Sequence, residues 1–208
     1  MEFVYVVKRQ DLFDLSFPHG FVAATPADPR VATWTGRIRE RGFFVERRWA
    51  ERDSSLKQVI PYTLLTCGDL VYLLRRTSAG GESRLHGKLS LGVGGHINPV
   101  DLAPGSDVLD AGCRRELEEE VEIRTPYGLQ AVGAINDDAT DVGSVHFGLV
   151  NVARCETPDV AIRETDVLEG RFIPRAELRA LARTERERFE TWSALILDRL
   201  DEALAAVR

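Results

Sequence analysis

The segment from Asp107 to Ile123 constrains the fold of this chain more than any other part of its sequence. At ~100° per residue, Glu116, Glu119 and Glu120 fall within an arc of about 100° on a helix, and Glu118 points in roughly the opposite direction. A stripe of apolar side chains runs along the same helix: Leu109, Cys113, Leu117 and Val121. The sequence therefore predicts a helix that packs on a core through this stripe and carries Glu116 and Glu120 close to its buried edge.

The crowded carboxylates of this helix suggest a metal site. Like charges four residues apart cost a few tenths of a kcal/mol even in solvent, and more near a low-dielectric edge. Oxygen ligands at this density suit Mg²⁺ or Mn²⁺. The alternative is a solvated helix in which Arg114 and Arg115 balance Glu118 and Glu119. A Gly-Gly pair that ends at Gly95, upstream of the helix, favours the metal site.

With these residues in place, the sequence resembles the Nudix hydrolase family. The family's motif runs Gly, five residues, Glu, seven residues, then Arg-Glu-U-x-Glu-Glu-x-Gly-U, where U is a bulky aliphatic residue. The stretch Arg115–Ile123 matches the second half of the motif, except that Glu122 replaces its Gly. Gly95 matches the leading Gly, and Asp107 stands eight residues before Arg115, where the family has Glu. This alignment requires an insertion of six residues, which we place within Asn98 to Gly105.

The resemblance covers roughly residues 58–182 and implies an activity. The usual reaction of the family is hydrolysis of a nucleoside diphosphate linked to another moiety, with Mg²⁺ or Mn²⁺ as cofactor. By resemblance, Glu116 and Glu120 are direct metal ligands, and Glu120 also belongs to the catalytic set. Glu119 is a ligand or a catalytic residue that orients water, and the carbonyl of Gly95 is a further ligand. Arg115 is expected to be structural, pairing with Asp107 and the helix carboxylates.

Several residues outside the motif are also candidates. Glu164 precedes the closing strand, where some family members place a catalytic or metal-binding carboxylate; an ordinary loop residue is an equal alternative, and Asp166 and Glu169 compete with it. The candidates for substrate binding are basic or aromatic side chains that could face a phosphate: Arg76, Lys88 and His96, with Arg75 and His86 beside them. A solvated loop face, or a packing role for His96, is the alternative. We expect His146 to be structural and the acidic turn of Asp137, Asp138 and Asp141 to be solvated.

Strand and helix signals place these motifs in an α/β (α+β) fold with a mixed sheet, which the resemblance refines to an α/β/α sandwich. Expected strands are Phe3–Val7, Val59–Leu65, Leu70–Leu74, Leu89–Val93, Leu129–Asn136, Ser144–Val152 and Arg171–Ile173. Expected helices are Thr33–Arg52, Asp107–Val121, Pro174–Ala182 and a long amphipathic C-terminal helix, Glu185–Val207. Accordingly, we expect residues 1–57 to form an extension that packs on the core, 58–182 the Nudix domain, and 183–208 a helix of the same globular unit.

Net charge, hydropathy and cysteine content limit the classes of partner and the cellular location that we expect. A net charge of −6 over 208 residues argues against nucleic acid or anionic lipid as the main partner. No apolar run approaches the ~20 residues that span a bilayer, and the N-terminus lacks the features of a secretory signal. Cys67, Cys113 and Cys155 are far apart in sequence and odd in number, so we expect free thiols in a cytoplasmic protein.

Two other functions remain open at this stage. An isopentenyl-diphosphate isomerase-like enzyme would need a Cys facing a Glu beside the metal, and Cys67 lies in no such motif. A non-catalytic Nudix domain that binds a ligand would commonly lack the carboxylates that this chain keeps. The sequence thus favours a small-molecule diphosphate as substrate, and the C-terminal helix is expected to pack on the domain or to supply a homodimer contact.

Overall fold

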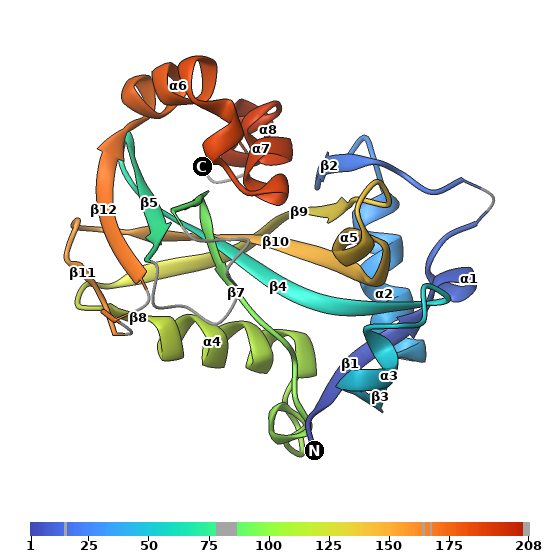
Figure 1. Cartoon of the computed structure of the whole chain (residues 1–208). Helices are drawn as coiled ribbons and strands as arrows, with labels where there is room; N and C mark the ends of the chain where they lie inside the picture. The colour runs from blue at the N-terminus through green and yellow to red at the C-terminus, as the bar shows by residue number, and fades with distance from the viewer. Residues whose placement is uncertain (15, 78–86, 164, 167, 206–208) are drawn as a thin grey trace.

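The computed structural model describes residues 1–14, 16–77, 87–163, 165–166 and 168–205. Its centre is a mixed sheet with the strand order β12-β5-β4-β10-β9-β2 (Figure 1). These strands are β12 (Leu168–Pro174), β5 (Leu70–Arg76), β4 (Leu56–Cys67), β10 (His146–Cys155), β9 (Tyr127–Asn136) and β2 (Gly20–Ala23). The central pair, β4 and β10, is parallel, and the other neighbours along this path are antiparallel.

Shorter strands extend the sheet at its edges. β1 (Phe3–Lys8) pairs with the start of β4 and with β3 (Phe43–Glu46), while β6 (Leu89–Ser90) and β7 (Gly92–Gly94) pair with β5 and β4 respectively. A separate two-stranded sheet joins β8 (Val121–Ile123) to β11 (Val160–Ile162). The mixed sheet is thereby confirmed, and the expected strands Val59–Leu65 and Leu70–Leu74 lie in β4 and β5, which pair as a hairpin.

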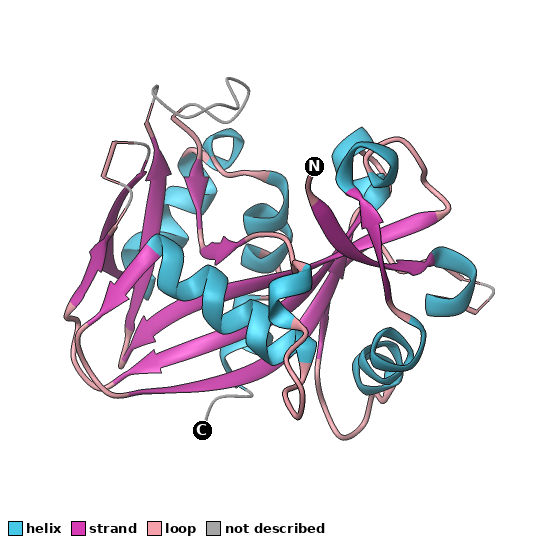
Figure 2. Ribbon diagram, turned by 90° about the horizontal axis from the view of Figure 1, so that it is seen from below, coloured by secondary structure: helices cyan, strands magenta, loops and turns pink. Residues whose placement is uncertain are grey.

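Helices cover both faces of the sheet. α4 (Val108–Glu120) lies on one face, and α6 (Arg175–Thr184), α7 (Thr191–Leu197) and α8 (Leu200–Ala205) lie on the other (Figures 1 and 2). β4 is buried along nearly its whole length, and most of its residues from Val59 onward are apolar because both faces of the strand are covered. Its Leu65 packs in one cluster with Leu117 of α4, and its Leu64 packs in another with Ile196 of α7. This arrangement is the expected α/β/α sandwich.

The N-terminal region adds three helices, α1 (Arg9–Leu12), α2 (Arg30–Arg41) and α3 (Arg47–Ala50). Phe13, Trp34 and Phe147 pack edge to face with ring centroids 5.7–5.8 Å apart. Since Phe147 belongs to β10, this aromatic cluster joins the N-terminal segment to the central sheet. A short helix α5 (Asp141–Val145) precedes β10, and single turns η2 (Pro99–Asp101) and η3 (Arg186–Arg188) complete the fold. No helix in the described part of the chain is long and apolar enough to cross a membrane.

The expected helix Thr33–Arg52 is wrong as one continuous helix. α2 ends at Arg41, the N–H of its C-cap residue Gly42 donates to the carbonyl of Ile38, and strand β3 separates α2 from the short helix α3. A Cβ at Gly42 would lie 2.2 Å from the ring of Tyr5, so only glycine lets the chain pass this ring. Beyond Gly42, pairing with β1 overrides the helical pattern.

The long C-terminal helix is also wrong, because the tail consists of η3, α7 and α8. Phe189 and Glu190 are extended where the chain meets β6. There the N–H of Glu190 donates to the carbonyl of Leu89 at 3.0 Å, and Phe189 is buried in the core. The apolar residues with helical spacing still face the sheet, so the pattern predicted burial correctly but not the breaks between helices.

Candidate active site

Asp107 fixes the start of the carboxylate-bearing helix. Its side chain accepts hydrogen bonds from the N–H groups of Leu109 and Asp110, as an N-cap residue does, and from Nε of Arg39 at 2.5 Å. Burial alone would raise the pKa of Asp107, but these hydrogen bonds hold it below its ordinary value. Asp107 is therefore committed to the cap and to Arg39.

Arg115 is held by a different aspartate from the one we expected. Its Nε and Nη2 donate to the two carboxylate oxygens of Asp101 at 2.8 and 2.9 Å, and Nη2 also donates to the carbonyl of His96. Asp101 is 4% exposed, so this is a nearly buried bidentate ion pair. The expected pairing of Arg115 with Asp107 is wrong.

The ion pair between Arg115 and Asp101 also changes where the six-residue insertion in the Nudix motif is placed. Asp101 is the sixth residue after Gly95, the spacing that the Nudix motif gives its first Glu. Arg115 follows Asp101 by 14 positions, where the motif has eight. The six additional residues therefore lie between Asp101 and Arg115 rather than within Asn98 to Gly105. Asp101 itself could have been found from this spacing.

Two helix carboxylates converge on the remaining nitrogen of Arg115. Nη1 donates to Glu116 Oε1 at 2.8 Å and to Glu119 Oε2 at 3.0 Å. A Cβ at Gly95 would lie 2.1 Å from Glu116 Oε2, so the backbone of the Gly-Gly turn lies directly against this carboxylate. Burial raises the pKa of Glu116, although the hydrogen bond from Arg115 opposes the shift. The structure thus brings together Gly95, Glu116 and Glu119 around one guanidinium.

The last turn of α4 carries the other carboxylates. Glu120 is half-buried, one turn beyond Glu116, whereas Glu118 and Glu119 are exposed. The carbonyl of Glu120 accepts the N–H of Arg163 at 2.9 Å, which brings the end of β11 to the end of α4. Glu164 and His86 lie outside the described residues.

Arg76 and Lys88 are adjacent through their backbones: the N–H of Arg76 donates to the carbonyl of Lys88 at 3.1 Å. Their side chains differ. Lys88 Nζ donates to the carbonyl of Glu187 at 2.5 Å, next to the helices of the far face. Arg76 stands two residues after Leu74, which packs on the α4 side, and its buried Nε has no hydrogen-bond partner among the described residues.

His96 contacts residues other than the carboxylates. Its Nε2 lies 3.0 Å from Gln58 Oε1, and its ring centroid is 5.7 Å from that of His146. The next residue, Ile97, packs against Gly112 of α4. Burial lowers the pKa of His96 to about 3, so the ring is neutral. His96 therefore brings no positive charge to a phosphate.

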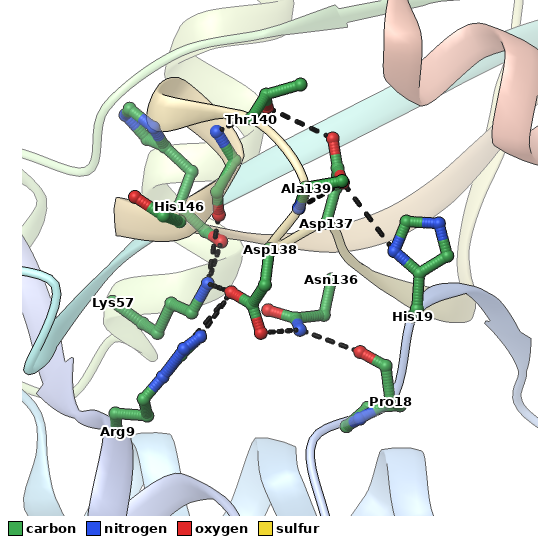
Figure 3. Close-up of polar contacts among 12 residues, drawn as sticks. Arg9, Pro18, His19, Lys57, Asn136, Asp137, Asp138, Ala139, Thr140 and His146 are labelled. Atoms are coloured by element: carbon green, nitrogen blue, oxygen red, sulfur yellow. Dashed lines mark hydrogen bonds and ion pairs between the residues drawn. The ribbon is translucent and has the colours of Figure 1, made fainter.

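The acidic turn after β9 is solvated only in part: Asp141 is exposed as expected, whereas Asp137 is buried and Asp138 is engaged in a polar cluster (Figure 3). Lys57, fully buried in β4, donates to Asp138 Oδ1 at 2.7 Å and to the carbonyl of Gly143 at 2.9 Å. Arg9 forms a second ion pair with Asp138. These groups neutralise one another, so the turn offers no second cation site.

A divalent cation fits the chemistry of the α4 site. Among the described residues, no three His, Cys, Asp or Glu side chains lie close enough as they stand to hold a metal ion. The donors are nevertheless carboxylate oxygens, which Mg²⁺ and Mn²⁺ prefer. The Glu116 carboxylate also lies against the backbone of Gly95, where there is no room for a side chain. Burial of Glu116 disfavours its ionised form, which a bound cation would stabilise.

Comparisons with known proteins agree with this fold. The chain is 35% identical to Protein YmaB of Bacillus subtilis (strain 168) over 204 residues, which cover 96% of this chain and 98% of YmaB. It is 30% identical to Tm1382, a candidate Nudix hydrolase, whose crystal structure superposes with a TM-score of 0.78 over 96% of this chain and 98% of Tm1382. The NUDIX domain of Shewanella oneidensis NrtR, solved with ADP ribose, is 16% identical with a TM-score of 0.50; the match covers 72% of this chain and 87% of that domain and shows a common fold. No protein-family model matches the chain.

Proposed function

The chain belongs to the Nudix hydrolase family, and on that premise we propose that it hydrolyses a diphosphate linkage in a nucleoside diphosphate derivative or a similar small molecule, with Mg²⁺ or Mn²⁺. One observation carries the proposal. Arg115, locked by the buried Asp101, reaches Glu116 and Glu119 beside the backbone of Gly95. Burying the Arg115–Asp101 ion pair costs desolvation free energy, and the need to hold the carboxylates of Glu116 and Glu119 in fixed positions explains why the fold keeps the pair.

The carboxylates of α4 divide the work. Glu116 and Glu120 would hold the cation with the carbonyl of Gly95, and Glu119, the most exposed of the three, would complete the ligand set or orient the attacking water. The bound cation supplies neutralisation of the diphosphate charge and a lowered pKa for water. Arg115 acts as a positioning residue, because all of its nitrogens are engaged by Asp101, His96 and the helix carboxylates.

Arg76 is the substrate-binding candidate that the structure supports best. Within the part of the chain that the structure describes, its buried Nε–H has no hydrogen-bond partner, and a phosphate oxygen is an acceptor that a guanidinium binds well. Lys88 already donates to the carbonyl of Glu187, on the side of the sheet away from α4, and His96 could donate only as a neutral ring. Glu164 remains our proposal for a further catalytic carboxylate, on the resemblance alone.

A panel screen tests the function. Nucleoside diphosphate derivatives, with ADP ribose among them because the NrtR domain was solved with it, would be incubated with the full chain and Mg²⁺ or Mn²⁺. Coupling to a phosphatase reports release of phosphate from the products. We expect turnover of at least one compound that is abolished by EDTA and restored by excess metal. Turnover that persists in EDTA, or none across the panel with either metal, would contradict the proposal.

A further inference from the structure

Two cysteines that are distant in the sequence meet at one end of the central sheet. Cys67 is the last residue of β4 and Cys155 is the last residue of β10. These strands are parallel and in register up to the pair Thr66 and Arg154, so the next step of the ladder sets Cys67 beside Cys155. The Sγ of Cys67 also lies 3.7 Å from the carbonyl oxygen of Glu156, the residue that follows Cys155.

The two thiols share a face of the sheet. Leu65 and Ala153 stand two residues before them and pack in the same cluster with Leu117 of α4. Because side chains alternate along a strand, Cys67 and Cys155 point to this same side. Neighbouring strands lie ~4.8 Å apart, within the range of ~4.4–6.8 Å between Cα atoms that a disulfide bridges.

The thiols differ in access. Both are free, Cys67 is half-buried, and Cys155 is 3% exposed. Burial raises the pKa of Cys155 to about 11, and the neighbouring Cys67 adds to this shift. An oxidant therefore meets Cys67 first. Cys113 takes no part, because it is buried on α4 with its Sγ 3.3 Å from Thr63 Oγ1.

We propose that Cys67 and Cys155 are a site of reversible oxidation, at which a peroxide converts the pair to an intramolecular disulfide. The Cys67 thiolate attacks one peroxide oxygen, the O–O bond breaks, and Cys67 becomes a sulfenic acid, while the departing hydroxide takes up the proton that the thiol released and leaves as the first water. The sulfur of Cys155 then attacks the sulfenic sulfur, the S–S bond forms, and the second water leaves. Two thiols lose two electrons, and hydrogen peroxide gains them to give two waters. A thiol reductant reverses the change.

Mass spectrometry of the full chain tests the site. Protein treated with hydrogen peroxide is alkylated, digested with trypsin and compared with untreated protein and with peroxide-treated protein reduced before alkylation. We expect a linked peptide pair containing Cys67 and Cys155, two hydrogens lighter than the free peptides, which disappears on reduction. Cys113 should stay alkylatable throughout as the internal reference. Neither step requires the proposed hydrolysis, so the outcome is independent of that function.

Matched variants sharpen the result. In Cys155→Ser, peroxide should leave a sulfenic or more oxidised Cys67 without any linked pair, and in Cys67→Ser, Cys155 should stay alkylatable at the same peroxide dose. The proposal is overturned if Cys155 of the unsubstituted protein stays fully alkylatable while Cys67 is oxidised, or if every linked pair joins two chains, as a non-reducing gel would show.

Discussion

Asp101 is the residue on which the geometry of the carboxylate helix depends. Removing its charge leaves the half-buried Arg115 without its bidentate partner, and breaking a buried ion pair in this way typically costs ~3 kcal/mol or more. We expect Asp101→Asn to lower the free energy of unfolding in urea by about 2–3 kcal/mol and to reduce kcat. Asp110→Asn, at an exposed position in the first turn of α4, is the control and should change the free energy of unfolding by less than ~0.5 kcal/mol. Equal effects of the two changes would contradict a special role for Asp101.

Glu116 and Glu120 are the residues whose charge the reaction requires. Replacing either by Gln keeps the shape and removes one formal charge from the metal site, so kcat should fall at least ~10²-fold, or about 3 kcal/mol in the barrier. Glu118→Gln, on the exposed side of the helix, should leave kcat within about threefold. The assay uses a panel substrate with saturating metal. Small, equal effects at all three positions would mean that the Glu run is only a solvated helix face.

The stability of Glu116→Gln without metal should depend on pH. Burial raises the pKa of Glu116 in the folded protein, so the ionised carboxylate is disfavoured there and its cost is present above the ordinary value of 4.5. The variant should match or exceed the parent in urea unfolding at pH 7, and this relative advantage should shrink as the pH falls through about 4.5. An advantage that grows toward acidic pH would contradict the assignment.

At the level of elements, the cluster around Lys57 joins α1, β4 and the turn after β9 (Figure 3). Burial alone would raise the pKa of Asp138, but hydrogen bonds from Arg9, Lys57 and Asn136 lower it to about 2, compared with 3.8 in the unfolded chain. A depressed carboxyl pKa contributes stability above ~4 that is lost as the pH falls through ~2. Asp138→Asn should therefore cost about 2 kcal/mol at pH 7 and progressively less from pH 4 to pH 2, measured by urea unfolding.

The exposed Asp141, in the same turn region, provides the matching control. Asp141→Asn should leave stability almost unchanged at both pH values. A loss for Asp138→Asn that is the same at pH 7 and pH 2 would indicate lost packing rather than a lost ion pair.

Elements with strong local signals were predictable from the sequence. The helix α4 has an N-cap and an apolar stripe, and the β4–β5 hairpin has two apolar strands around a turn at Gly68, so each is specified by its own residues. The four-residue strand β2 was not predicted, because a segment so short has no measurable period and forms only by pairing with β9. The partner of Arg115 was missed because Asp107 has the motif's spacing to Arg115, whereas Asp101 has the motif's spacing to Gly95 and was not considered.

For the molecule as a whole, the C-terminal tail closes one face of the core. Ile196, Leu200, Ala203 and Leu204 of α7 and α8 are buried against the sheet. A chain ending at Thr184 would expose this apolar face, so we expect it to aggregate, which size-exclusion chromatography and light scattering would show. Ile196→Ala in the full chain should instead stay monodisperse while losing ~2–4 kcal/mol in urea unfolding. A soluble truncated chain with normal turnover would contradict this role of the tail.

The parallel pairing of β4 and β10 also governs when the protein can fold. His146 of β10 lies opposite Gln58 of β4, so the central pair joins residues that are far apart in the sequence. During synthesis β1, β3 and β4 emerge early, and α4 follows to cover one face of β4, but β10 and the tail helices that cover the other face are made last. Contacts of such long range form slowly and expose nascent strands to association with other chains. We therefore expect refolding from urea to be slow and its yield to fall as the protein concentration rises.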